Sequence, residues 1–147
     1  GYAHDRGLDF IETLCHPSLI QPVLDRFTPD ALKVASRDLT NEPLIETLGQ
    51  TGLPIILSTG MASLVDIERA ISTVGHDDIL ILHCLSSYPA NFSDLNLARI
   101  ARLKKVFGFH VGYSDHSIGF VAPVCAVAMG AVAVGDFVEQ GPGFKRG

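Results

Sequence analysis

The sequence predicts a fold of the α/β class, in which parallel strands alternate with helices. Short β-branched or aliphatic runs recur roughly 22 to 27 residues apart along the 147-residue chain, and segments with helical periodicity lie between them. The strand runs are continuously apolar instead of alternating, which is typical of strands covered on both faces. We therefore expect a parallel sheet wrapped by helices, either an open doubly wound sheet or a (β/α)8 barrel of the TIM type.

The expected strands are the most apolar of these short runs. In chain order they lie at residues 8–11, 32–35, 54–57, 79–83, 106–111 and 132–134.

The expected helices fill the intervals between the strands. In chain order they lie at residues 17–27, 42–50, 62–74, 95–105 and 118–129. Pro17 suits a first helical turn, Asp94 can cap the fourth helix, and Gly75 suits the end of the third. The pattern is thus strand–helix repeated five times, followed by a last strand.

The number of repeats limits the architecture. A complete barrel has eight strand–helix units and about 250 residues, whereas this chain supplies about six units in 147 residues. If the fold is a barrel, we expect residues 1–147 to form an incomplete one, as a single partial domain. The chain begins without Met and ends in a glycine-rich tail at 141–147, so we expect both ends to be cut or divergent.

Composition and charge narrow the class of partner. The net charge is −5, and no basic cluster is denser than Lys104-Lys105, which argues against nucleic acid or an anionic membrane surface. The three cysteines form no CxxC pair, as expected for a protein of the reducing cytoplasm. Glycine and proline interrupt the apolar run at 118–134, so we expect a buried helix and strand there and no membrane span. A small-molecule ligand fits these observations.

Both architectures bind ligands at the carboxyl ends of their strands. Polar side chains follow each of the first five expected strands. These residues include Thr13, Ser36, Asp38, Ser58, Ser86, Tyr88, Ser114 and His116. Ser58 also leads into a helix, where it could help to receive a phosphate or carboxylate, or could simply cap that helix.

Two residues stand out for their chemistry. Lys33 is a cation inside an otherwise apolar strand, where it requires an anion such as a bound substrate, unless it lies at an edge or beside an acidic residue. His116 can bind a divalent metal or act as an acid or base near neutral pH, although a single histidine more often has a structural hydrogen bond. His83 and His110 lie within expected strands, where we expect core imidazoles.

Five linked motifs resemble the sialic acid synthase family in order and spacing. They are KVAS at 33–36, TNEPL at 40–44, GLPIILSTGM at 52–61, HCLSSYP at 83–89 and GYSDHSIG at 112–119. The resemblance runs from about residue 10 to residue 133 and corresponds to the middle and later part of that family's catalytic (β/α)8 barrel.

The resemblance implies a condensation between phosphoenolpyruvate and an N-acylated amino sugar. Phosphoenolpyruvate adds through its C3 to the aldehyde of an N-acylmannosamine-type sugar, which gives a nonulosonic acid and phosphate. A divalent metal, Mn²⁺ or Mg²⁺, is the implied cofactor, and a homodimer is the candidate assembly.

The same resemblance assigns roles to individual residues. Those that look like phosphoenolpyruvate contacts are Lys33, Ser36, Ser58, Ser86, Ser114 and, in a diverged loop, Thr13. Tyr88 looks like a sugar-side tyrosine, and Asp38 stands where the family usually has a glutamate that orients the sugar or transfers a proton. His116 resembles one of two metal-binding histidines. We therefore expect Asp38, His116 and Lys33 to be catalytic, and His116 to bind the metal.

The sequence also departs from the family. The second metal histidine is absent near the last strand, where Asp136 or Glu139 is the nearest source of an oxygen ligand. We expect the first strands of the family's barrel and its C-terminal antifreeze-like domain to be absent.

Three functions remain open at this point. The leading hypothesis is a partial sialic acid synthase barrel. The second is a Schiff-base aldolase that uses Lys33, and the third is a non-catalytic fragment that retains an anion pocket.

Overall fold

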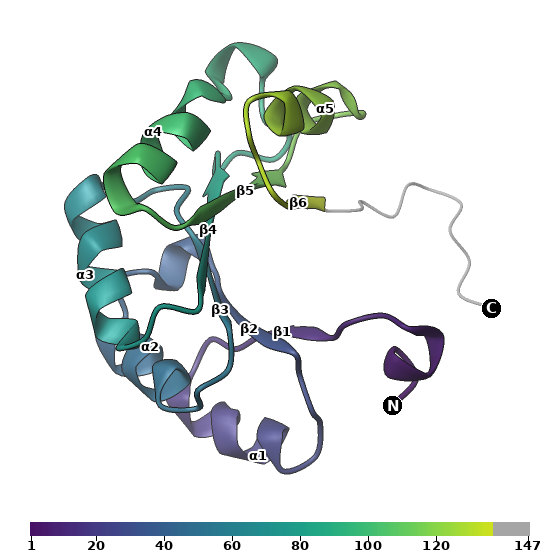
Figure 1. Ribbon diagram of the computed structural model, residues 1–147, viewed down its shortest axis with the longest axis vertical. Coiled ribbons are helices and arrows are strands. Elements are labelled where there is room, and N and C mark those ends of the chain that lie inside the picture. The colour runs from purple at the N-terminus through teal and green to yellow at the C-terminus, as the bar shows by residue number, and fades with distance from the viewer. Residues whose placement is uncertain (137–147) are drawn as a thin grey trace.

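A computed structural model describes residues 1–136 and shows one curled sheet of six parallel strands (Figure 1). The strands pair in sequential order and are β1 (Ile11–Thr13), β2 (Ala31–Val34), β3 (Ile55–Ser58), β4 (Ile79–Cys84), β5 (His110–Asp115) and β6 (Val134–Asp136). The helices are α1 (Ile20–Leu24), α2 (Glu42–Gly49), α3 (Leu64–Val74), α4 (Ala98–Phe107) and α5 (Val121–Ala128).

Figure 1 shows the helices along the outer side of the curl. A doubly wound sheet would reverse its strand order and carry helices on both faces, whereas sequential parallel strands with an outer layer of helices form the arc of a barrel. The expectation of an incomplete (β/α)8 barrel is therefore confirmed.

The two faces of the sheet differ because successive side chains of a strand point in opposite directions. Leu57 and Ile81 lie on the outer face and belong to the large core beneath the helices. The inner face has a smaller apolar cluster of Ala31, Ile56 and Leu82. The large core thus holds the helices on the sheet, and the inner face is left to bear polar groups near the strand ends.

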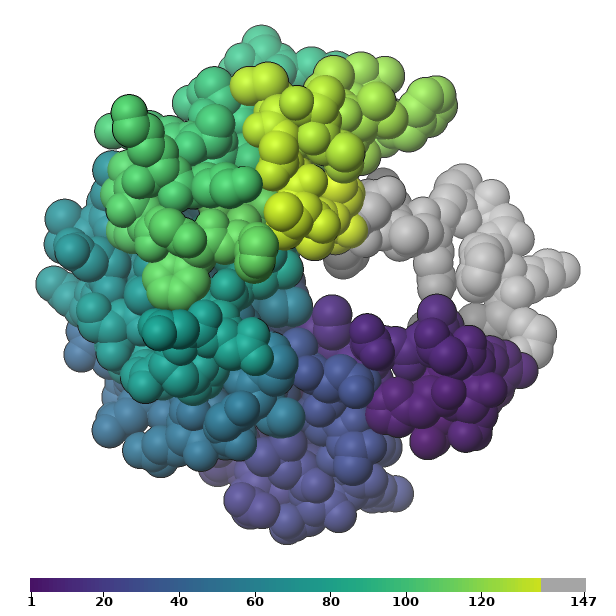
Figure 2. Space-filling model, in the orientation of Figure 1, coloured from purple at the N-terminus to yellow at the C-terminus, as the bar shows by residue number. Residues whose placement is uncertain are grey.

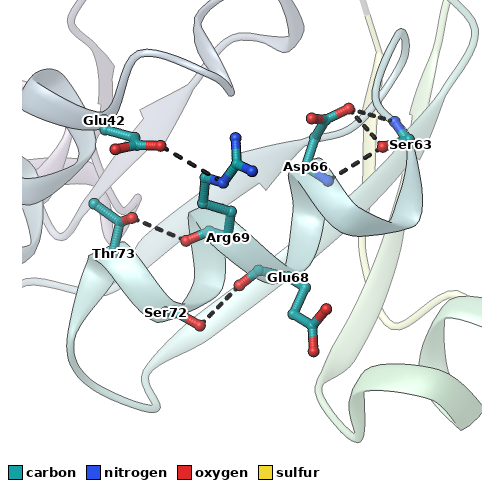
Figure 3. Close-up of polar contacts among 7 residues, drawn as sticks. All are labelled: Glu42, Ser63, Asp66, Glu68, Arg69, Ser72 and Thr73. Atoms are coloured by element: carbon teal, nitrogen blue, oxygen red, sulfur yellow. Dashed lines mark hydrogen bonds and ion pairs between the residues drawn. The ribbon is translucent and has the colours of Figure 1, made fainter.

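Local signals fix the ends of helix α3, which packs beside α2. Ser63 and Asp66 form a capping box in which each side chain accepts a hydrogen bond from the other residue's backbone N–H (Figure 3). Gly75 ends the helix in the left-handed conformation, with φ 78°. Arg69 and Glu42 form an ion pair between α3 and α2 at 3.6 Å, which contributes little because both side chains are exposed.

Helix length also bears on membrane association. No helix in the part of the chain that the structure describes is long and apolar enough to span a membrane.

The expected position of the fifth strand is wrong by four residues. Residues 106 and 107 still belong to α4, which ends at Gly108 with φ 76°. The β-branched Val106 suggested a strand, but it lies on the exposed side of that helix. The strand therefore contains Tyr113 and Ser114 instead of preceding them.

Smaller differences concern other elements. β1 begins three residues later than expected, at Ile11. The expected first helix is a 3-10 turn (Pro17–Leu19) followed by the short α1, which ends at Leu24. His110, expected in the core, is exposed, whereas His83 is buried and bonded to the carbonyl oxygen of Leu95 at 2.7 Å, as expected.

Replacement of Leu57 by Ala should test the outer core. Leu57 is fully buried between β3 and the helices, so we expect the free energy of unfolding to fall by about 2–5 kcal/mol in urea denaturation. The matched control is Val65→Ala on α3, because Val65 is 61% exposed and its truncation should cost less than about 0.5 kcal/mol. Equal losses in the two variants would contradict the assigned packing.

Candidate active site

A pocket of about 360 Å³ lies at the carboxyl ends of β2 to β5. The space-filling view shows the hollow centre of the curl, between the purple N-terminal segment and the yellow residues near β6 (Figure 2). The residues that line the pocket are Lys33, Ala35, Ser36, Arg37, Ser58, Met61, Cys84, Ser86, Tyr88, Ser114 and His116. The structure thus brings together seven of the residues singled out in the sequence, from four different strands or the loops that follow them.

The hydroxyl groups of the pocket crowd around Gly60. The N–H of Gly60 donates to Ser36 Oγ at 3.0 Å, and Ser36 Oγ lies 3.1 Å from Cys84 Sγ. A Cβ atom at Gly60 would stand 2.3 Å from Ser86 Oγ and 2.9 Å from Cys84 Sγ, so a larger residue would have to displace these side chains. Glycine therefore lets the polar side chains converge here, and when the Cys84 thiol donates to Ser36, the Ser36 hydroxyl is free to donate into the pocket.

Ser58 is the most deeply buried hydroxyl of the pocket. The residue is 2% exposed, and its Oγ has no hydrogen-bond partner among the described residues. A buried hydroxyl without a partner costs about 1–3 kcal/mol. An acceptor on a bound ligand would remove that cost, so Ser58 points to a ligand more directly than its exposed neighbours do.

Lys33 lies within the sheet and not at its edge. It pairs in register with Thr13 of β1 and Ile56 of β3. No carboxylate among the side chains described for residues 1–135 lies within ion-pair distance of its ammonium group. Burial lowers the pKa of Lys33, and the nearby thiols of Cys84 and Cys15 partly oppose this. Neither an edge position nor an acidic neighbour therefore accounts for this cation among the described residues. A bound anion is the explanation that is left.

His116 is held in one orientation by the loop after β4. Its Nδ1–H donates to the carbonyl oxygen of Leu85 at 2.7 Å, which leaves Nε2 as the acceptor. The Tyr88 hydroxyl donates to Nε2 at 3.0 Å, and the two rings stack with their centroids 4.1 Å apart. Ser114 Oγ lies 3.4 Å from the same nitrogen. The structure thus orients the imidazole so that Nε2 faces the pocket's polar groups.

The described residues do not form a metal site by themselves. Among the side chains of residues 1–135, no group of three His, Cys, Asp or Glu comes together, whereas catalytic metals usually have about three protein ligands. His116 Nε2 is one suitable ligand, and Glu139 lies outside the described residues. The expectation of Mn²⁺ or Mg²⁺ stays a prediction.

Two expected site residues do not line the pocket. The Asp38 carboxylate forms an ion pair with Arg37, with Nε and Oδ2 3.5 Å apart, and Thr13 is exposed at the end of β1. Their expected roles stay predictions.

The structure adds lining residues that the sequence reasoning missed, among them Arg37, Met61 and Cys84. Cys84 and Met61 lay inside quoted motifs. Only the alternation of β4, however, shows that the Cys84 side chain faces inward beside Ser114, its partner in register.

Comparisons with known proteins identify relatives along almost the whole chain. A protein family described as the NeuB family matches residues 1–138. The uncharacterised protein MJ1065 of Methanocaldococcus jannaschii is 44% identical over 142 residues, which are 95% of this chain and 41% of that protein. The N,N'-diacetyllegionaminic acid synthase of Legionella pneumophila is 40% identical over 139 residues, which are 90% of this chain and 39% of the relative.

A solved structure supports the same relationship. The crystal structure of the N-acetylneuraminic acid (sialic acid) synthetase of Leptospira borgpetersenii, in complex with citrate, superimposes with a TM-score of 0.84 at 38% identity. The match covers 90% of this chain and 47% of that structure. The chain therefore spans less than half the length of these relatives.

Replacement of Lys33 by Met should raise stability in the absence of ligand. Because burial lowers the pKa of Lys33 in the folded state, holding its proton destabilises the fold at neutral pH. We expect the midpoint of thermal unfolding to rise by roughly 2–4 °C, the equivalent of about 1 kcal/mol in a domain of this size. The gain should shrink as the pH rises towards 10.5, the ordinary pKa, since wild-type Lys33 then loses its proton.

The matched control is Lys105→Met, at the exposed end of α4. A midpoint that falls in Lys33→Met, or rises equally in both variants, would contradict the account of Lys33.

Proposed function

Because the chain belongs to the NeuB family, we propose that it forms the phosphoenolpyruvate-binding part of a synthase that makes a nonulosonic acid. The proposed acceptor is an N-acylated amino sugar of the mannosamine type. The name of the Legionella relative, a legionaminic acid synthase, and that of the sialic acid synthetase structure support this class of product. The proposed role is carried by one observation: Lys33 and the unpartnered Ser58 hydroxyl line the same pocket.

The proposed reaction joins two carbon atoms and releases phosphate. C3 of phosphoenolpyruvate bonds to the aldehyde carbon of the open-chain sugar, and the aldehyde oxygen takes up a proton. Water adds at C2 of phosphoenolpyruvate, and phosphate leaves from the same carbon. Until phosphate leaves, the reacting molecule carries both a phosphate and a carboxylate, so the pocket must hold two charged groups up to that step.

The pocket is suited to a phosphate and a carboxylate. The Lys33 ammonium supplies positive charge, and it has no carboxylate partner within residues 1–135. The hydroxyls of Ser36, Ser58 and Ser86 supply donors around it. Arg37 adds a second cation at the rim, where its guanidinium also contacts Cys15 Sγ at 3.2 Å. A dianionic ligand would thus replace the hydration of these groups with charge-assisted hydrogen bonds.

The wall formed by Tyr88 and His116 is the proposed sugar side. Tyr88 is largely exposed at the mouth of the pocket, and its ring covers the imidazole. With the proton on Nδ1, His116 Nε2 accepts a hydrogen bond from the Tyr88 hydroxyl, so the pair can pass a proton to or from a substrate hydroxyl. The bond from His116 Nδ1–H to Leu85 keeps that lone pair oriented while it does so.

Phosphoenolpyruvate binding should depend on Lys33 and Ser58. In isothermal titration calorimetry we expect Lys33→Met to weaken binding by more than about tenfold, because a charged hydrogen bond contributes about 1.5–3 kcal/mol. Ser58→Ala should weaken it by roughly fivefold, because a neutral donor is lost.

The matched controls for this titration are Lys105→Met and Ser72→Ala, which change exposed residues on the outer helices. Binding that is equal in wild type and both pocket variants would rule out the proposed site.

Turnover should depend on His116. A synthase that contains this chain is expected to release phosphate from phosphoenolpyruvate only when N-acetylmannosamine or a related acceptor is added, in the presence of Mn²⁺. His116→Ala should lower that rate by at least about 100-fold, in the range of a lost general acid or base. His110→Ala is the matched control, since His110 is an exposed histidine at the start of β5, the strand that His116 follows.

The lowered pKa of Lys33 also favours the Schiff-base alternative, because a neutral amine can attack a carbonyl carbon. Borohydride would then trap the substrate on Lys33. Such trapping, or a His116→Ala variant with the full rate, would contradict the proposal.

A further inference from the structure

Asp115 is a fully buried carboxylate that the proposed reaction does not use. It ends strand β5 and is 0% exposed. Its neighbour in the chain, Ser114, lines the pocket, so the alternation of the strand turns Asp115 to the opposite face of the sheet. Burial of a carboxylate is costly unless hydrogen bonds satisfy it. Its position directly before His116 therefore calls for an explanation.

Three donors satisfy this carboxylate. The Tyr113 hydroxyl donates to Oδ1 at 3.0 Å, and the Ser117 N–H donates to the same oxygen at 2.9 Å. The Ser117 hydroxyl donates to Oδ2 at 3.1 Å. Burial and the neighbouring Asp115 raise the pKa of Tyr113, so the phenol keeps its proton and remains a donor. The side chain thus ties the strand on one side of His116 to the turn on the other.

His116, which lies between Asp115 and Ser117 in the chain, also forms hydrogen bonds to the loop after β4. The His116 carbonyl oxygen accepts the Ala90 N–H at 2.8 Å, and its imidazole Nδ1–H donates to the Leu85 carbonyl oxygen at 2.7 Å. Both bonds form only while the turn after β5 holds His116 within hydrogen-bond distance of that loop. A looser turn would release the imidazole from Leu85, and either ring nitrogen would then carry the proton.

We propose that Tyr113, Asp115 and Ser117 are positioning residues that fix His116 in the Nδ1–H tautomer with Nε2 towards the pocket. They act through His116 and do not touch the substrate. The catalytic use of His116 rests on the proposed function. The tautomer of His116, in contrast, is a property of the ligand-free chain.

The tautomer can be measured by long-range ¹H–¹⁵N correlation on ¹⁵N-labelled chain at pH 8, above the ordinary pKa of histidine. The wild type should show a protonated Nδ1 and an unprotonated Nε2 for His116, a resonance identified by its loss in His116→Ala. Tyr113→Phe should show signals averaged between the two tautomers, because the turn that holds His116 against Leu85 loses one of its hydrogen bonds.

Ser117 provides a milder second variant. Ser117→Ala removes one of its two hydrogen bonds and should shift the signals less than Tyr113→Phe does, in the same direction. Ser117→Thr, which keeps the hydroxyl, should restore them. The matched controls are Tyr2→Phe and Ser72→Ala, which change exposed residues far from β5 in the sequence.

Circular dichroism establishes that each variant is folded. The wild-type tautomer in both folded Tyr113→Phe and Ser117→Ala would overturn the inference. If Tyr113→Phe does not fold, the two Ser117 variants decide. A tautomer that changes in Ser117→Ala and returns to the wild-type form in Ser117→Thr supports the inference. A wild-type tautomer in Ser117→Ala overturns it. A tautomer that responds as expected in a chain that does not bind phosphoenolpyruvate would support the positioning role and count against the proposed function.

Discussion

Alternation along parallel strands is the constraint on which this structure depends. Each strand turns one set of side chains towards the helices and the next set towards the centre of the curl. On β5, this places Tyr113 and Asp115 in the outer layer and Ser114 on the inner face, one residue apart. The apolar contacts that hold the helices and the polar groups that form the pocket are therefore fixed by the same backbone geometry.

The pocket concentrates features that lower stability in the ligand-free chain. Lys33 is a cation within the sheet, and the Ser58 hydroxyl is buried without a partner in the described residues. The side chains of Cys84 and Ser86 fill the space beside Gly60. The large outer core, with residues such as Leu57 and Ile81 fully buried, offsets the costs of Lys33 and Ser58. The outer layer thus supplies the stability, and the inner end carries the polar groups of the pocket.

Much of the fold could be predicted from the sequence, because apolar runs and helix caps are local signals. Six evenly spaced runs predicted a parallel sheet covered by helices, and the resemblance of five motifs to a known family favoured the barrel over the doubly wound sheet. The start of β5 could not be predicted, since Val106 suits a strand locally, and only Gly108 marks the end of α4. Among the site residues, hydroxyls after strands were visible in the sequence, but the ion pair of Asp38 with Arg37 depends on how the loop after β2 folds. The buried bonds of Asp115 likewise appear only in three dimensions.

The central claim is that Lys33 and Ser58 bind the anionic groups of phosphoenolpyruvate. A crystal structure of the chain grown with saturating phosphoenolpyruvate tests it most directly. The account predicts a phosphate or carboxylate oxygen within about 3.2 Å of both the Lys33 Nζ atom and the Ser58 Oγ atom, with His116 still bonded to Leu85. A ligand bound elsewhere, or a pocket that holds only water at that concentration, would contradict it.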